Sequence, residues 1–299
     1  MLSPDQKSLR ARCKNLLRRA YRGVRPNEEF PLPERPGAAT QLALMQSYRQ
    51  LAAVAPQKLP KLSEVGFRAF SQFEEDGILL YIFSLLGTTS RVCVEICAGN
   101  GTECNTTNLI INHGWWGHLF DGRERNVEAG KAFFGKHPDT YLYPPRFNHA
   151  WITAENVNDL ISNSGAHGEI DLLSLDLDGV DYWIWKAITV IQPRVVVCEV
   201  HNPIPADKAI TMPYQKDFIF ESDDYRGASL AAMAKLGAVK GYRLVGVHRF
   251  GFNAFFIRDD IADPYFPAVS VASCLEDPFT LESRRTRWPA VSGHPWIQV

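Results

Sequence analysis

The sequence predicts an α/β protein built on a doubly wound, mostly parallel seven-stranded sheet whose last strand is antiparallel. Beyond Ser71, seven apolar strand-like runs alternate with helix-like runs, which is typical of a parallel sheet with helices on both faces. The last two strand-like runs are joined only by the dipeptide "FG", which is too short for a helical crossover, so we expect an antiparallel hairpin there. The first strand-like run ends in a glycine-containing turn that leads into a helix.

Each element is predicted from its local pattern. The strands are RVCVEI (91–96), WGHLFDG (116–122), FNHAWIT (147–153), IDLLSLDLD (170–178), PRVVVCEV (193–200), YRLVGVHR (242–249) and FNAFFIRD (252–259). The helix before the first strand should begin at Ser71 as its N-cap, with Glu74 completing a capping box, and should end at Gly87. Further helices are expected over 39–54, 104–114, 126–137, from Ala154 with Thr153 as its cap, 181–188 and 227–240.

The chain divides into three predicted parts. Residues 1–60 form a basic helical N-terminal extension with a Pro-rich linker, residues 61–258 the sheet domain, and residues 259–299 a C-terminal extension. Residues 7–25 carry eight Lys and Arg and no acid along an amphipathic stripe. This segment could contact an anionic membrane, a partner or an import receptor, or pack as a surface helix on its own domain.

Composition limits the classes of function. The net charge of −1 and the pI of about 6.7 give no reason to expect a nucleic-acid partner. The six cysteines show no pairing or zinc spacing, so we expect reduced thiols in a cytoplasmic protein. No apolar run approaches the roughly 18–20 residues of a membrane span. Membrane association or organelle targeting through the basic segment remains an alternative.

The turn after the first strand predicts a nucleoside-bearing cofactor. Gly99 and Gly101 allow a close approach to the backbone, and Asp121 ends the next strand where a carboxylate can accept ribose hydroxyls. A dinucleotide turn starting at Gly99 would need its third glycine at Cys104, which disfavours NAD. The alternative motif is an acid followed by a glycine at every second position. Here Glu95 is the acid, Gly99 and Gly101 are the second and third glycines, and Cys97 takes the place of the first. Because cysteine is small, we expect a shifted turn there.

Five segments resemble a known family. "SQFEEDGIL", "VEICAGNGTECNTTNLI", "GHLFDG", "IDLLSLDLDGVDYWIWKAI" and "PRVVVCEVHNP" resemble, in order and spacing, FkbM-like class I methyltransferases, which have a Rossmann-like fold and use S-adenosylmethionine. The resemblance covers about residues 68–258. It implies a small-molecule hydroxyl acceptor, such as a sugar or a natural-product intermediate.

The resemblance also implies roles for individual residues. Glu95, Gly99 and Gly101 would surround the methionine and ribose end of the cofactor, and Asp121 would accept the ribose hydroxyls. Glu155 would lie at the adenine amino group, or simply in the first turn of its helix. Asp176, ending the fourth strand, would lie beside the position of methyl transfer.

Polar residues at the ends of the fourth and fifth strands are the candidate catalytic groups. Alternation places Asp176 and Asp178 on one side of the strand, where repulsion should raise one pKa. Asp181 is expected to cap the next helix. His201 is the predicted general base, with a surface loop histidine as the alternative. In a second mechanism, Asp176 or Asp178 together with Asn202 would hold Mg²⁺ and acidify the acceptor hydroxyl.

Two other functions remain open on the sequence alone: an NAD-type oxidoreductase on the same fold, and a non-catalytic binding or tethering protein with a degenerate cofactor site. The long loop over 203–226 is expected to act as a substrate lid. Trp183 and Trp185 cannot both face one pocket, so one of them should lie in the core.

Overall fold

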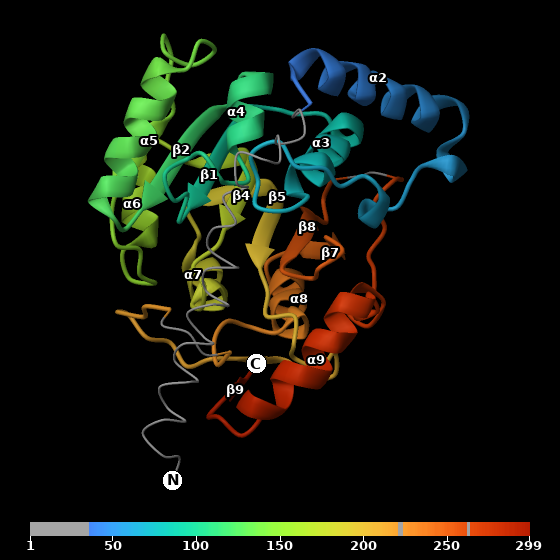
Figure 1. Cartoon of the computed structure of the whole chain (residues 1–299), viewed down its shortest axis with the longest axis vertical. Helices are drawn as coiled ribbons and strands as arrows, with labels where there is room; N and C mark the ends of the chain where they lie inside the picture. Colours follow the sequence, from blue (N-terminus) through green and yellow to red (C-terminus); the bar gives the residue numbers. More distant parts are fainter. Residues whose placement is uncertain (1–35, 221–223, 262–263) are drawn as a thin grey trace, which may run out of the picture. The chain divides into compact units, whose positions relative to one another are not determined.

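The computed structural model describes residues 36–220, 224–261 and 264–299. Residues 37–299 form one compact unit (Figure 1). The basic helix predicted within residues 7–25 lies outside the described residues. None of the described helices is long and apolar enough to cross a membrane.

A seven-stranded sheet forms the centre of this unit. Its strands are β1 (Val92–Ile96), β2 (Trp116–Asp121), β3 (Arg146–His149), β4 (Gly168–Leu175), β5 (Ile191–Glu199), β7 (Tyr242–Val247) and β8 (Asn253–Arg258). Their order is β3-β2-β1-β4-β5-β8-β7, and β8 runs antiparallel to both of its neighbours. This is the Rossmann-like fold of class I methyltransferases, and the predicted fold class is confirmed.

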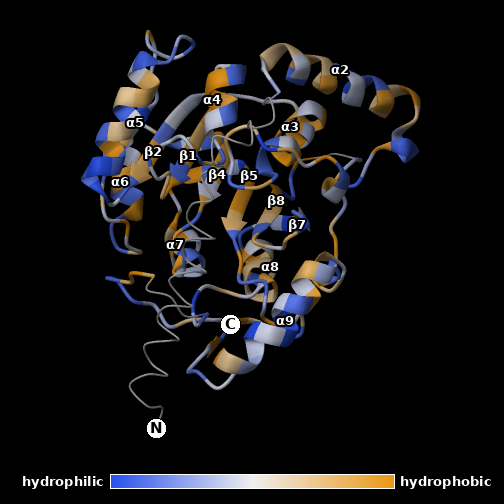
Figure 2. Ribbon diagram, viewed as in Figure 1, coloured by the Kyte–Doolittle hydropathy of each residue, from blue (hydrophilic) through white to orange (hydrophobic). Residues whose placement is uncertain are grey.

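Helices cover both faces of the sheet because side chains alternate along each strand. Val195 and Val197 of β5 pack with α3 (Glu75–Leu86), α4 (Thr107–His113) and α5 (Glu124–Lys136). Val196 and Cys198 point the other way, toward α6 (Val157–Ser164), α7 (Asp181–Ala187) and α8 (Leu230–Val239). Figure 2 shows β5 as mostly hydrophobic, whereas α5 carries both hydrophobic and hydrophilic residues. Trp185 is fully buried, while Trp183 donates its Nε1–H to the backbone oxygen of Met212 (2.9 Å), so one tryptophan lies in the core as predicted.

Two helices begin later than predicted. α3 begins at Glu75, because the Asp76 carboxylate accepts the backbone N–H groups of Ala69, Phe70 and Ser71 and holds them in a turn. The expected capping box at Ser71 is therefore wrong, while the end at Gly87 (φ 67°) is confirmed.

α6 begins at Val157 rather than at Ala154. Thr153 and Asn156 exchange hydrogen bonds between backbone N–H groups and side-chain oxygens, at 2.8 and 3.3 Å, which closes a separate turn before the helix. The local polar side chains compete with the first helical turn at both sites.

The terminal segments pack onto the sheet unit. α2 (Ala38–Val54) packs against α3 and ends before Pro56, as predicted. Three short 3₁₀ helices, Pro56–Lys58, Leu62–Glu64 and Ser273–Leu275, lie within the connecting segments. After β8 the chain forms α9 (Pro278–Val291), and β9 (Ile297–Gln298) pairs antiparallel with β6 (Ile210–Thr211). The C-terminal segment thus holds the loop over 203–226.

Candidate active site

The turn after β1 is shaped by three residues with positive φ: Cys97 (66°), Gly99 (56°) and Gly101 (74°). A Cβ added to Gly99 would meet nothing within 4 Å, so this backbone faces open space. A Cβ at Gly101 would lie 2.6 Å from the Phe134 ring, so glycine is required there by packing. The two glycines therefore have different roles: Gly99 leaves room for a ligand, and Gly101 allows α5 to approach.

Glu95 holds the segment that follows this turn through hydrogen bonds to its carboxylate. Its Oε1 accepts the N–H of Asn105 (2.9 Å) and the hydroxyl of Ser174 (3.2 Å), and its Oε2 accepts the N–H of Thr106 (2.9 Å). Both carboxylate oxygens are thus committed to the segment that leads into α4. The geometry favours a role in holding the turn over the direct cofactor contact predicted for Glu95.

Asp121 lies beside the turn, because β2 pairs in parallel with β1. The N–H of Ala98 donates to the backbone oxygen of Phe120 (2.9 Å), which ties the turn to the end of β2. The Oδ1 atom of Asp121 accepts the N–H of Arg123 (2.8 Å) and the Nδ2 group of Asn126 (3.0 Å). Its Oδ2 atom accepts no hydrogen bond within the described part of the chain. One fixed carboxylate oxygen is therefore available for a ligand hydroxyl.

Cys97 lies at the meeting point of the strand ends. The side chain is accessible to solvent, but the surrounding strand ends partly desolvate it. Desolvation raises the pKa of the thiol well above its ordinary value, and four carboxylates raise it further: Asp121, Asp181, Asp176 and Asp178. The structure therefore gathers the predicted acids of β2 and β4 around the turn.

A Cys97→Gly variant tests the cost of the side chain in the turn. A left-handed conformation costs a non-glycine residue about 1–2 kcal/mol, part of which is returned as unfolded-state entropy, so we expect a gain of about 0.5–1 kcal/mol in the free energy of unfolding. Urea titration measures this gain. Cys97→Ala is the matched control, because it removes the thiol but keeps the Cβ atom. An equal gain in both variants would show that backbone strain is not the cause.

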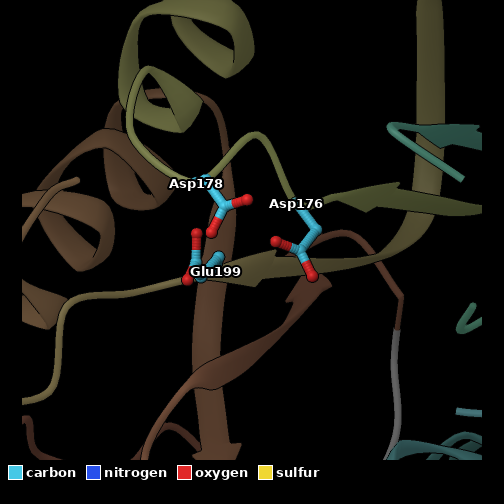
Figure 3. A group of neighbouring side chains, drawn as sticks. All are labelled: Asp176, Asp178 and Glu199. Atoms are coloured by element: carbon cyan, nitrogen blue, oxygen red, sulfur yellow. The ribbon is translucent and has the colours of Figure 1, made fainter. Parts of the chain in front are cut away.

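Three carboxylates converge at the ends of β4 and β5 (Figure 3). Carboxylate oxygens of Asp176, Asp178 and Glu199 all lie within 4.8 Å of one another. The Arg226 guanidinium provides the balancing charge: it pairs with Asp178 and, at 3.2 Å, with Glu199. It also lies over the Phe220 ring, 4.4 Å from the centroid. Within the described residues, the Asp176 carboxylate accepts no hydrogen bond.

Burial raises the pKa values of three carboxyl groups at these strand ends. Burial, followed by the charges of Glu199 and Asp178, raises the pKa of Asp176 well above its ordinary range. Burial also raises the pKa of Glu199 to about 8, although Arg226 opposes this shift. Asp181 has a pKa of about 6 because of burial; it accepts the N–H groups of Leu177 (2.8 Å) and Gly179 (3.2 Å), and so holds the turn before α7. Glu199 therefore keeps its proton at neutral pH, and Asp176 loses its proton at a higher pH than an exposed aspartate does.

This protonation predicts a pH dependence of stability. A carboxyl group whose pKa is raised on folding stabilises the protein fully below its unfolded pKa, and this stabilisation is lost as the pH rises toward the folded pKa. For Glu199 that window runs from about 4.5 to about 8. We expect the free energy of unfolding to fall by about 2 kcal/mol between pH 6.5 and 8, and Glu199→Gln to flatten this slope. Urea titrations across this range measure it, and an unchanged slope in the variant would contradict the assignment.

His201 lies behind this cluster in a buried position. Its Nε2–H donates to the backbone oxygen of Asp224 (2.6 Å). Burial, with the charges of Arg226 and Arg287, lowers the pKa of His201 to about 3. A histidine with this pKa is a weak base, so the structure does not favour the general-base role predicted for it.

Asn202 is separate from the acidic cluster. Its Nδ2 group donates to the backbone oxygen of Phe250 (2.8 Å), and its Oδ1 atom accepts from Ser283 and Arg287 of α9, each at 3.3 Å. The structure therefore does not bring Asn202 to the two aspartates that were predicted with it as Mg²⁺ ligands; the third carboxylate beside them belongs to Glu199.

The part of the predicted lid loop over 203–220 lies along the same edge of the sheet. The Tyr214 hydroxyl donates to Glu155 (2.7 Å), and Trp151 donates its Nε1–H to the backbone oxygen of Lys216 (3.0 Å). The hydrogen bond from Tyr214 lowers the pKa of the exposed Glu155. A Cβ added to Gly179 would meet the Phe218 ring at 2.2 Å, so this part of the loop lies against the end of β4. The placement fits the predicted lid.

Sequence reasoning missed Arg226 as a site residue and passed over Glu199 in favour of His201. The missed signal was one of charge: three or more acids predicted at adjoining strand ends require a nearby cation. Arg226 ends the predicted lid loop, where no local pattern distinguishes it from Lys208 or Lys216.

The strand order and the position of the site define a class I methyltransferase fold. No protein-family model matches the sequence, and no curated protein sequence matches it. Among solved structures, the chain is similar to an S-adenosylmethionine-dependent methyltransferase from Clostridium acetobutylicum (10% identity, 72% of this chain and 99% of that one, TM-score 0.39). It is also similar to the magnesium protoporphyrin IX methyltransferase of Synechocystis with bound SAM (12% identity, 82% of this chain and 96% of that one, TM-score 0.35). A third similar structure is the O-methyltransferase of Bacillus cereus in complex with SAH (13% identity, 77% of this chain and 92% of that one, TM-score 0.41). At these identities and TM-scores, the fold assignment rests on the strand order of the chain itself.

Proposed function

We propose that the chain is an S-adenosylmethionine-dependent O-methyltransferase that acts on a hydroxyl group of a small molecule, such as a sugar or a natural-product intermediate. The observation that carries this proposal is the open turn at Gly99, with the unused Oδ2 atom of Asp121 on one side and the acidic cluster at Asp176 on the other. This arrangement fits an adenosyl group laid across the carboxyl ends of the strands. The acceptor class follows from the family resemblance.

The residues present match the needs of the cofactor. Asp121 would accept a ribose hydroxyl, and the backbone around Gly99 would approach the ribose and methionine end. Glu155 would remain near the adenine end of the crevice, tied to the loop through Tyr214. When bound, S-adenosylmethionine supplies a methyl group on a sulfonium, which leaves as a neutral thioether and needs no proton.

The protein must therefore orient the acceptor and take its proton. We assign the proton to Asp176, because its carboxylate accepts no hydrogen bond within the described residues and its raised pKa makes its ionised form a stronger base than an ordinary aspartate. In this role, a free carboxylate oxygen of Asp176 would accept the proton of the acceptor hydroxyl. Asp178 and Glu199 hold Arg226, whose charge would take the place that Mg²⁺ occupies in the alternative mechanism.

Calorimetric titration of the full chain tests the proposal. We expect S-adenosylmethionine and S-adenosylhomocysteine to bind with one site per chain and NAD not to bind. Binding of NAD alone would indicate an oxidoreductase, and binding of neither cofactor would indicate a non-catalytic protein. Either result would end the methyltransferase proposal.

Asp121→Ala should weaken S-adenosylhomocysteine binding by about 1.5–3 kcal/mol, because a ribose hydroxyl loses a charged acceptor. The same calorimetric titration measures this loss. Asp139→Asn, on the exposed turn that follows α5, serves as the control for a lost carboxylate. Unchanged affinity in Asp121→Ala would refute the ribose contact.

A further inference from the structure

A cavity of about 300 Å³ is lined by residues of α2, α3 and α4 and by residues beside the amino end of β1. It lies away from the strand ends that form the candidate active site. Its size is at the lower end of the range of small-molecule sites. The buried floor is apolar and is formed by Leu80, Phe83, Leu109 and Trp115. Arg49 and Arg91, which are both exposed to solvent, are among its lining residues.

Arg91 has an unusual backbone. Its φ angle is +54°, a conformation that favours glycine. The backbone is held on both sides: its N–H donates to Asp171 (2.6 Å), and its carbonyl oxygen accepts the N–H of Trp116 (2.8 Å). The guanidinium makes no hydrogen bond or ion pair within the described part of the chain. A strained residue with an unpaired charge at a cavity is a reason to look for a ligand.

Three other polar side chains of the wall are held by hydrogen bonds. Arg49 uses its Nε–H on the backbone oxygen of Ser84 (3.0 Å). His113 donates its Nε2–H to Gln41 (2.8 Å), and the Nδ2 group of Asn112 donates to Asn108 (2.7 Å). Among the residues that the structure describes, no acidic side chain lines the cavity. The wall therefore presents an apolar floor with positive charge that nothing in it neutralises.

The geometry points to a second binding site in this cavity, for a small molecule that joins one anionic group to an aromatic or aliphatic body. The body would lie against Phe83 and Trp115, and the anionic group, a carboxylate, sulfonate or phosphate, would pair with Arg91 and the free end of Arg49. This inference does not depend on the proposed methyltransferase activity.

Fluorescence titration of the full chain with anilinonaphthalenesulfonate tests the site, with uncharged phenylnaphthylamine as the matched probe that lacks the anion. We expect one sulfonate probe to bind per chain. Arg91→Gly should weaken its binding about 10-fold or more and leave binding of the uncharged probe nearly unchanged, because only a charge-assisted contact is lost. Glycine suits the positive φ of this position, so the variant should fold.

Two further variants complete the test. Met45→Trp should fill the cavity and weaken both probes, whereas Arg285→Gln, which removes an exposed arginine of α9, should change neither. Sulfonate binding that is insensitive to Arg91→Gly would place the probe elsewhere and overturn the inference. Absence of sulfonate binding to the unmodified chain would overturn it as well.

Discussion

Replacing Asp176 by asparagine is expected to lower kcat by about 100- to 10,000-fold, the usual contribution of a general base. The amide keeps the size of the side chain but cannot accept the proton of the acceptor hydroxyl. The affinity for S-adenosylhomocysteine should stay nearly constant, because the proposed cofactor contacts lie at the turn and at Asp121. The measurement is methyl transfer from labelled S-adenosylmethionine to an acceptor found by screening hydroxyl compounds.

The pH profile separates this role from a structural one. Because desolvation and the neighbouring acids raise the pKa of Asp176, the unmodified enzyme should gain rate as the pH rises and the carboxyl group loses its proton. The rate of the Asp176→Asn variant should not show this rise with pH. Asp159→Asn, on an exposed position of α6, is the matched control and should retain both rate and profile. A fully active Asp176→Asn enzyme would exclude Asp176 as the base.

Arg226→Met is expected to have the largest effect on stability. Removing one partner of a largely buried ion pair costs about 3 kcal/mol, because the remaining charges lose their compensation. The cost should be greater at pH 8 than at pH 5, because at the lower pH Asp176 and Glu199, whose pKa values are raised, are protonated in the folded state and need no counter-charge. Urea titration at the two pH values measures the difference. An equal loss at both would indicate lost packing on Phe220 rather than lost charge.

The same variant should gain a metal site. Three carboxylates within 4.8 Å of one another, freed from the guanidinium, offer the hard oxygen ligands that divalent cations prefer. We expect millimolar Mn²⁺ to raise the melting temperature of Arg226→Met and to leave that of the unmodified chain unchanged. Adding Asp178→Asn to the Arg226→Met variant should abolish this Mn²⁺-dependent rise in melting temperature. A similar Mn²⁺ shift in the unmodified chain would show that Arg226 does not replace the cation.

Much of the candidate site could be read from the sequence, because the ends of parallel strands meet at one edge of a sheet. Asp121 and Asp176 were placed correctly beside the turn by counting from their strands alone. The roles of Glu95 and His201 could not be read in this way. The partners of Glu95 follow the turn it supports, and His201 is buried by a loop and a helix, with Arg287 lying 86 residues beyond it in the sequence.

The sequence by itself determined the sheet, its antiparallel hairpin and the left-handed turn at Gly99 and Gly101, since these follow from periodicity, loop length and the conformational freedom of glycine, all of which act over a few residues. Only the tertiary structure decided which charges meet. Arg226 reaches Asp178 across 48 positions of sequence, and Asn202 is committed to α9 rather than to the acids. Coulombic pairing depends on distance in space and on burial, neither of which a local pattern encodes.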